Sequence, residues 1–286
     1  MLPYIHLFGI DIPMYTVMAV AGAAALSLFC VLQCRFPRPS PPVIKTYDIF
    51  YMLLYAFIGA IVGAKLLYLL TSVEVYWVSH WSFWDNMRYW GLLIAGGGLV
   101  FYGGLIGALL GALRYTVHFK TPVSAMLDLG FAGVPLFHAF GRIGCFMAGC
   151  CYGTEYHGIF AVTFPESNIG KAPADVELLP VQLTEAFLNL ILWAALLVIY
   201  RRTTRRWLTS GLYLTCYGVM RFILEFFRGD IIRGSVFSLS SSQFISIFIV
   251  AAGALLLINP KWLDSFGGKN DETYKEQLEK AERTAQ

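Results

Sequence analysis

The sequence predicts an all-α polytopic membrane protein of about seven transmembrane helices, and three observations carry this prediction. Of the 286 residues, 57% are hydrophobic and only 14% are charged, and the mean hydropathy is +0.62. Soluble domains carry about 25% charged residues, so lipid is the expected solvent. Seven stretches approach the roughly 20 apolar residues that a helix needs to cross a bilayer. Lys and Arg residues also gather in alternate connections between these stretches.

The seven stretches follow one another with few charges inside them. The first is uncharged, the second holds one charge in its apolar part (Lys65), and the third is rich in glycine. The first also lacks a preceding basic region and a small-residue cleavage pattern, so we expect a retained span and not a signal peptide. The expected spans are residues 13–34, 47–70, 91–113, 123–148, 182–200, 211–227 and 241–258.

The connections between the spans differ in positive charge. Nine Lys and Arg residues lie in the first, third and fifth connections, and four lie in the second, fourth and sixth. Because positive residues favour the cytoplasmic side, we expect the N-terminus outside and the C-terminus inside. Residues 1–260 are expected to form one membrane domain, and residues 261–286 a charged cytoplasmic tail.

Two connections are long, residues 71–90 and 151–181, and both are expected on the outer side. The first carries four tryptophans, which is typical of a membrane interface, and the second is polar and net acidic. A small external head or arm is therefore expected. The net charge of +3, with no Lys/Arg tract, gives no indication of a nucleic-acid partner.

Ionisable residues within the fourth and sixth spans are the first functional signal. Charges at bilayer depth are costly, so they usually face a polar cavity and mark function. Arg142 lies in the fourth span, and Arg221 and Glu225 share one face of the sixth, with Arg228 seven residues after Arg221. The alternative is an Arg–Glu pair that only ties helices together.

Glycine-rich segments are the second signal. Gly103, Gly107 and Gly111 recur every four residues, which favours close helix packing. The alternative is that backbone N–H groups in this glycine run bind an anion. A further segment, residues 141–153, begins with Gly-Arg-Ile-Gly. Arg142 between these glycines leaves a guanidinium that can bind a phosphate with two hydrogen bonds.

These residues together resemble the bacterial prolipoprotein diacylglyceryl transferase family. Its signature has the form Gly-Arg-x-Gly-Asn-Phe-x-Asn-x-Glu-x-x-Gly, and its second motif is His-Gly-Gly-Leu-Ile-Gly. The chain resembles a divergent member, with the matches in chain order from Tyr15 to Gln243. They are Tyr15, residues 103–107, Asp128, Gly141, Arg142, Gly144, Phe146, Gly153, Gln182, Glu185, Arg221, residues 225–228, Ser242 and Gln243.

The resemblance implies an enzyme of the bacterial plasma (inner) membrane. It would transfer the diacylglyceryl group of phosphatidylglycerol to the lipobox cysteine of a prolipoprotein, releasing glycerol phosphate and forming a thioether. Its partners would be phosphatidylglycerol, the prolipoprotein signal peptide and other membrane lipids. The resemblance implies neither a cofactor nor a metal ion.

The roles that the resemblance implies for these residues concern the negative charge that develops on the departing phosphate. Arg142 and Arg221 would stabilise that charge, and Glu225 would orient an arginine or balance its charge. Tyr102 is the fourth expected catalytic residue. The residues expected to bind substrate are Tyr15, Gly103, Gly104, Cys145, Gly153 and Arg228.

The chain departs from the family pattern at several polar positions. Tyr102 replaces the histidine, and with an ordinary pKa near 10 it suits hydrogen bonding better than proton abstraction. Cys145, Ala148 and Cys150 replace two asparagines and a glutamate, and Cys151 follows. The three cysteines are open to three interpretations: apolar packing, a disulfide on an oxidising outer face, or a metal or redox site.

This combination of retained and changed family positions is consistent with two functions. The retained Arg142, Arg221, Glu225 and Tyr15 favour an active transferase. The changed positions favour the alternative, a family paralogue without this activity that binds lipid or handles thiols in the membrane.

Overall fold

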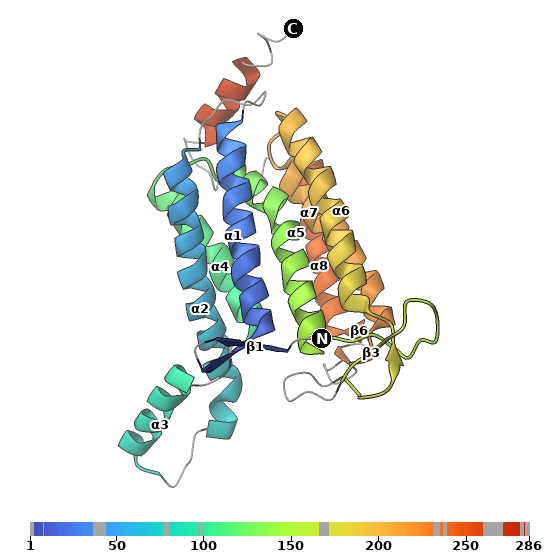
Figure 1. Ribbon diagram of the computed structural model, residues 1–286. Helices are drawn as coiled ribbons and strands as arrows, with labels where there is room; N and C mark the ends of the chain where they lie inside the picture. Colours follow the sequence, from blue (N-terminus) through green and yellow to red (C-terminus); the bar gives the residue numbers. More distant parts are fainter. Residues whose placement is uncertain are drawn as a thin grey trace. The chain divides into compact units, whose positions relative to one another are not determined.

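The computed structural model describes residues 3–7, 9–36, 44–76, 81–96, 98, 100–165, 172–230, 235–236, 239–259, 271–280 and 283. These residues are mostly helical (Figure 1), which confirms the all-α membrane class. The chain divides into two compact units. One holds residues 1–42 and 124–286, and the other holds residues 43–123.

Five helices within the described residues are long and apolar enough to cross a bilayer. All five match expected spans within a few residues over their apolar parts, and the fourth and seventh expected spans agree at both ends. A count of seven spans stays a prediction. The five are α1 (Met14–Arg35), α2 (Thr46–Tyr76, apolar over Thr46–Thr71), α5 (Val123–Ala148), α6 (Val181–Arg202) and α8 (Ser241–Ile258).

The expected third span, residues 91–113, is wrong as a single helix. Its first residues end α3 (Phe83–Gly96), and a separate helix, α4 (Phe101–His118), begins after the glycine run at 96–98. Glycine loses more backbone entropy in a helix than any other residue, so consecutive glycines end one readily. Apolar composition continued across this break, and composition alone did not reveal it.

The smaller unit is built on α2 and α4, which pack through glycines on both helices. A Cβ at Gly107 would clash with the carbonyl oxygen of Gly59, and one at Gly103 with that of Gly63. The backbones can approach this closely only because no side chain intervenes. The packing interpretation of the glycine face is therefore confirmed. Asp48 on α2 also accepts a buried hydrogen bond of 2.8 Å from the Tyr115 hydroxyl on α4.

The larger unit contains α1, α5, α6, α7 (Leu208–Leu224) and α8. The sixth expected span divides between α7 and a 3₁₀ turn, η1 (Glu225–Phe227). Among the described residues, three antiparallel pairs of short strands lie at one end of this unit (Figure 1). They are β1–β2 (Tyr4–Leu7 and Ile10–Pro13), β3–β4 (Val162–Thr163 and Glu177–Leu178) and β5–β6 (Ser235–Val236 and Leu239–Ser240).

Small residues also bring α7 and α8 together. A Cβ at Gly218 of α7 would lie 2.7 Å from Cγ2 of Val250, and one at Gly253 of α8 would lie 2.7 Å from the backbone nitrogen of Thr215. At the N-terminus of α8, Ser240 and Gln243 form a reciprocal capping box. This cap fixes where α8 begins, next to the end of α7.

The glycine contact predicts a difference between two neighbouring substitutions on α4. Gly107→Ala should destabilise the protein by about 1–3 kcal/mol, because the added methyl group meets the backbone of α2. Gly104→Ala is the matched control, since its Cβ would lie 3.5 Å from its nearest neighbours. Thermal unfolding in detergent measures both variants. Equal melting temperatures would contradict the glycine contact.

Candidate active site

Arg142 lies near the C-terminal end of α5 and forms an ion pair with α6. Its Nε is 2.9 Å from Oε1 of Glu185, a side chain that is only 2% exposed, whereas that of Arg142 is 20% exposed. A buried carboxylate needs a compensating charge, and Arg142 supplies it. The arginine is thereby fixed in direction while part of it stays accessible.

Arg221 is buried at the end of α7. Its Nη2 lies 2.6 Å from Oε2 of Glu225, one helical turn further on, and donates a hydrogen bond of 2.9 Å to Oγ of Ser242 on α8. Its Nη1 is also buried and has no hydrogen-bond partner within the described part of the chain. A buried N–H group without a partner is costly, and this one keeps the capacity to donate a hydrogen bond.

Arg228 follows η1 and completes the charged group. Its Nε and Nη2 donate to the two carboxylate oxygens of Asp230 at 2.8 and 2.7 Å. Glu225 Oε2 lies 3.9 Å from Nε of Arg228, so this carboxylate interacts with both Arg221 and Arg228. Asp230 was not expected from the sequence. Its position two residues after an arginine is a weak signal.

Tyr217 connects Arg142 to Arg221. It interacts electrostatically with both arginines and with Glu185, and it is hydrogen-bonded to Arg142. The structure thus brings together the three expected arginines and Glu225, and adds Glu185, Tyr217 and Asp230. Three positive and three negative side chains balance, which permits this much charge at low exposure.

Cys145 and Cys150 meet because of the way α5 ends. Gly149 has φ +71°, the N–H of Cys150 bonds to the carbonyl of Cys145 at 3.1 Å, and that of Gly149 bonds to the carbonyl of Phe146 at 3.2 Å. These are the two hydrogen bonds of a Schellman cap. The cap turns the chain back, so the residue after Gly149 lies over the last turn of the helix.

Cys151 joins the other two cysteines through an unusual backbone conformation. Its φ is +62°, which is uncommon for a residue with a side chain. The three Sγ atoms lie within 4.8 Å of one another, and all three side chains are half-buried. Hydrogen bonds from the thiols of Cys145 and Cys150, followed by the charges of Arg228 and Arg142, lower the pKa of Cys151. The cysteines therefore belong to the arginine site.

The chain after the cysteines is fixed by backbone contacts on both sides. Gly153 donates to the carbonyl of Leu179 at 3.2 Å and pairs with Arg228 in a β-bridge. A Cβ at Gly153 would clash with the Leu179 carbonyl oxygen. Gln182, at the start of α6, donates a 2.8 Å hydrogen bond to the carbonyl of Cys150. Two residues that match the family signature therefore position the cysteine turn and Arg228.

The remaining expected site residues occupy different places. Tyr15 on α1 is half-exposed, and its Cα would lie 3.1 Å from a Cβ at Gly144 on α5. Tyr102, Gly103 and Gly104 belong to the first turn of α4 in the smaller unit, where Gly103 packs on α2. The roles given to these residues stay predictions. His138 on α5, which is not among the expected site residues, shares a 3.2 Å hydrogen bond with Tyr213 on α7.

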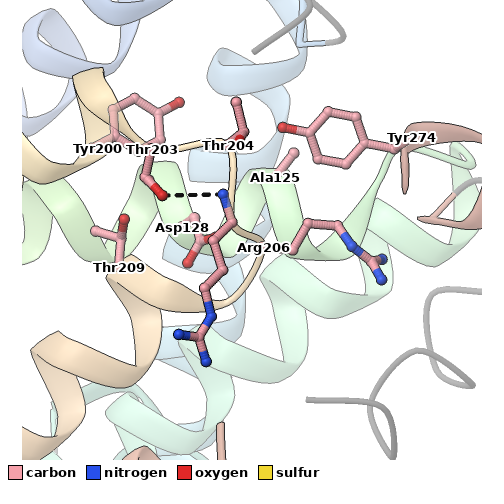
Figure 2. A pocket seen from close by; sticks show the side chains of 9 residues that line it. Ala125, Asp128, Tyr200, Thr203, Thr204, Arg206, Thr209 and Tyr274 are labelled. Atoms are coloured by element: carbon pink, nitrogen blue, oxygen red, sulfur yellow. Dashed lines mark hydrogen bonds between the residues drawn. The ribbon is translucent and has the colours of Figure 1, made fainter. Parts of the chain in front are cut away.

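A small polar pocket lies at the opposite end of α5 from Arg142 (Figure 2). Asp128 lies 14 residues before Arg142, about 21 Å along the helix. Its carboxylate accepts hydrogen bonds from the backbone of Trp207 at 2.7 Å, and from the backbone and hydroxyl of Ser210 at 2.8 and 2.6 Å. Asp128 thus caps the N-terminus of α7 from another helix.

The C-terminal segment contributes to the same pocket. Residues 271–280 are helical, and Tyr274 lines the pocket beside Arg206 (Figure 2). Asp271 accepts hydrogen bonds from Ser124 on α5 and lies 3.8 Å from Nη1 of Arg206. These contacts attach residues 271–280 to the helices. The polar residues of the pocket are therefore explained by helix capping and by the attachment of this segment.

The helices and the charged site define the class of the protein: a polytopic helical membrane protein with paired arginines and half-buried thiols at one end of its helices. The chain belongs to the prolipoprotein diacylglyceryl transferase family, whose model matches residues 3–259.

Similar proteins from several bacteria support this membership. The chain is 34% identical over 254 residues to phosphatidylglycerol–prolipoprotein diacylglyceryl transferase 2 of Clostridium perfringens, covering 88% of this chain and 92% of the relative. It is 36% identical over 251 residues to the transferase of Clostridium tetani, covering 87% and 93%. It is 30% identical over 260 residues to that of Idiomarina loihiensis, covering 90% and 91%.

The helix cap made by Asp128 predicts a graded loss of stability. Asp128→Ala should lower the free energy of unfolding by about 2–3 kcal/mol, because three buried donors lose a charged acceptor. Ser210→Ala removes only one of these hydrogen bonds and should cost about 1 kcal/mol. Thermal unfolding in detergent measures the graded effect. An unchanged Asp128→Ala protein would show that the carboxylate does not hold α7.

Proposed function

We propose that this chain transfers the diacylglyceryl group of phosphatidylglycerol to the lipobox cysteine of prolipoproteins and releases glycerol phosphate. The observation that carries the proposal is the arginine site, formed from signature residues of the transferase family. Relatives named for this reaction match the chain over most of their own length.

The arginines suit a reaction in which a phosphate ester departs. Negative charge grows on the phosphate as its bond to the glycerol carbon breaks, and preorganised donors stabilise that charge best where water is scarce. Arg221 offers a buried N–H group that has no partner among the described residues, and Arg142 offers a partly exposed guanidinium. Glu185 and Glu225 orient the two arginines, so no reorganisation is needed when the charge develops.

The membrane arrangement is part of the same proposal. The chain is a multi-pass protein of the bacterial plasma membrane with seven spans, α4 and α7 being the two beyond the five apolar ones. The Lys and Arg distribution favours an outer N-terminus and a cytoplasmic C-terminus. In this orientation the C-terminal end of α5, with Arg142, faces the outer leaflet. There it meets both the lipid headgroup and the exported prolipoprotein.

One observation favours a second function. Three thiols converge beside the arginines, at positions where the family signature has an amide, a carboxylate and one unspecified residue. A paralogue that binds an anionic lipid and handles thiols would keep the arginines and gain the cysteines. Transfer to a lipobox peptide distinguishes the two functions.

The decisive assay uses the full chain in detergent with phosphatidylglycerol and a lipobox peptide. The peptide should gain the mass of a diacylglyceryl group. Arg142→Ala should lower kcat by about 10² to 10³, the usual cost of losing one donor to developing negative charge. Arg202→Ala, an exposed arginine at the end of α6, is the matched control and should keep full activity. No product from the unsubstituted chain would favour the paralogue.

Glu185 should act through Arg142. Glu185→Gln keeps an acceptor oxygen but removes the charge that fixes Arg142, so kcat should fall by at least about tenfold while KM for phosphatidylglycerol changes less. Glu185→Ala should fall further. Steady-state kinetics on protein of verified melting temperature separate this positioning effect from unfolding. Full activity of both variants would show that Arg142 needs no orientation.

A further inference from the structure

The three cysteines form a cluster with a defined geometry that the transfer reaction does not explain. Cys145 is fixed by α5, Cys150 by the Schellman cap and by Gln182, and Cys151 by a strained φ of +62°. Strained backbone persists where the surrounding structure requires it, and it gathers at functional sites. Apolar packing of the cysteines would require neither the helix cap, nor the hydrogen bond from Gln182, nor the positive φ of Cys151.

The spacing of the thiols suits a metal ion better than a disulfide. A tetrahedral zinc ion with Zn–S bonds of about 2.3 Å holds its sulfur ligands about 3.8 Å apart. The three Sγ atoms, all within 4.8 Å of one another, need to close by only about 1 Å to reach this arrangement. A disulfide joins two sulfurs at about 2.05 Å and leaves the third without a role.

The surrounding charge also suits thiolate ligands. Arg142 and Arg228 both interact electrostatically with Cys151. Three thiolates with a divalent ion carry a net charge of −1, and the guanidinium groups of Arg142 and Arg228, although each also faces a carboxylate, attract that charge. Soft thiolate ligands select zinc and copper(I) over harder ions. Of these two, the divalent ion leaves less negative charge to compensate.

We propose that Cys145, Cys150 and Cys151 bind a thiophilic metal ion of the Zn²⁺ class, whose fourth position takes the acceptor cysteine of the prolipoprotein as a thiolate. Three protein ligands and an open fourth position are the usual form of catalytic zinc sites. The second half of this proposal rests on the proposed transferase function. The metal ion would also deprotonate the acceptor thiol, which Tyr102, standing in place of a histidine, is poorly suited to do.

The reaction balances without a side-chain base. Coordination makes the acceptor thiol a thiolate and releases its proton to water. The thiolate sulfur attacks the glycerol carbon and forms the C–S bond. The C–O bond to the phosphate breaks, its electron pair stays on oxygen, and glycerol phosphate leaves beside Arg142 and Arg221. The metal ion keeps its charge throughout, so no oxidant or reductant is needed.

Cobalt(II) titration of the reduced, full-length protein in detergent tests the metal site. One equivalent should produce a sulfur-to-cobalt charge-transfer band and the intense visible bands of tetrahedral cobalt, and Zn²⁺ should displace it. Cys145→Ser and Cys151→Gly should weaken binding by more than about 100-fold, since each removes a direct ligand. Glycine accepts the φ of Cys151, so the second variant should fold. Cys216→Ser, an exposed cysteine on α7, is the control and should bind normally.

Two results would overturn the metal site. One is a reduced chain that gives no thiolate–cobalt band. The other is a band that survives in Cys151→Gly. A purified chain whose mass shows a disulfide, and which takes up no metal after reduction, would likewise overturn the metal site.

A lipobox peptide tests the fourth position. Adding it to the cobalt-loaded protein should intensify the charge-transfer band, and a peptide with serine in place of the cysteine should not. Equal spectra with both peptides would overturn the acceptor role. A chain whose spectrum responds to the cysteine peptide but which transfers no diacylglyceryl group would refute the proposed transferase and keep the metal site. Transfer at the full rate by metal-free protein would support the transferase and overturn the role of the metal ion in activating the acceptor.

Discussion

The pairing of buried arginines with buried carboxylates is the constraint on which the functional end of this protein depends. An unpaired charge at low exposure costs several kcal/mol, so Arg142, Arg221 and Arg228 each lie against a carboxylate at 2.6–2.9 Å. The partners come from α6, from the turn after α7 and from the segment beyond it. These elements cannot move far apart without exposing a charge. The same ion pairs therefore hold the helix ends together and aim the guanidinium groups.

The end of α5 carries the second constraint. Gly149 stops the helix with a left-handed residue, and the chain that leaves it is fastened at once by Gln182, Leu179 and the backbone at 227–229. This fastening explains why Gly153 has no room for a side chain. It also places the thiols beside the arginines, so the turn that ends the helix is the turn that builds the site. The same few residues therefore end the helix and position the thiols.

Close packing holds the helices together within each of the two units. Lipid offers no hydrophobic drive between helices, so van der Waals contact and hydrogen bonds must hold them. Glycines of α2 and α4 in one unit, and of α7 and α8 in the other, let the backbones approach closely. Asp128 adds a polar contact by capping α7 from α5, far from the arginines.

The sequence by itself determined the membrane class, most span positions, the glycine face and the arginines of the site. Composition and spacing are local properties, and α5 and α8 begin and end where apolar composition begins and ends. The cap at Gly149 was also readable, since glycine after a helix is a local signal. The break between α3 and α4 was missed because the stretch stays apolar across its glycines.

Only the tertiary structure decided which groups meet. Glu185 lies 43 residues from Arg142, and no spacing rule pairs them. The left-handed turn at Cys151 and the bond from Gln182 bring three thiols together, although the same spacing in an extended loop would separate them. Pairing across helices depends on packing direction and on the cost of leaving charge unpaired, and both exist only once the chain has folded.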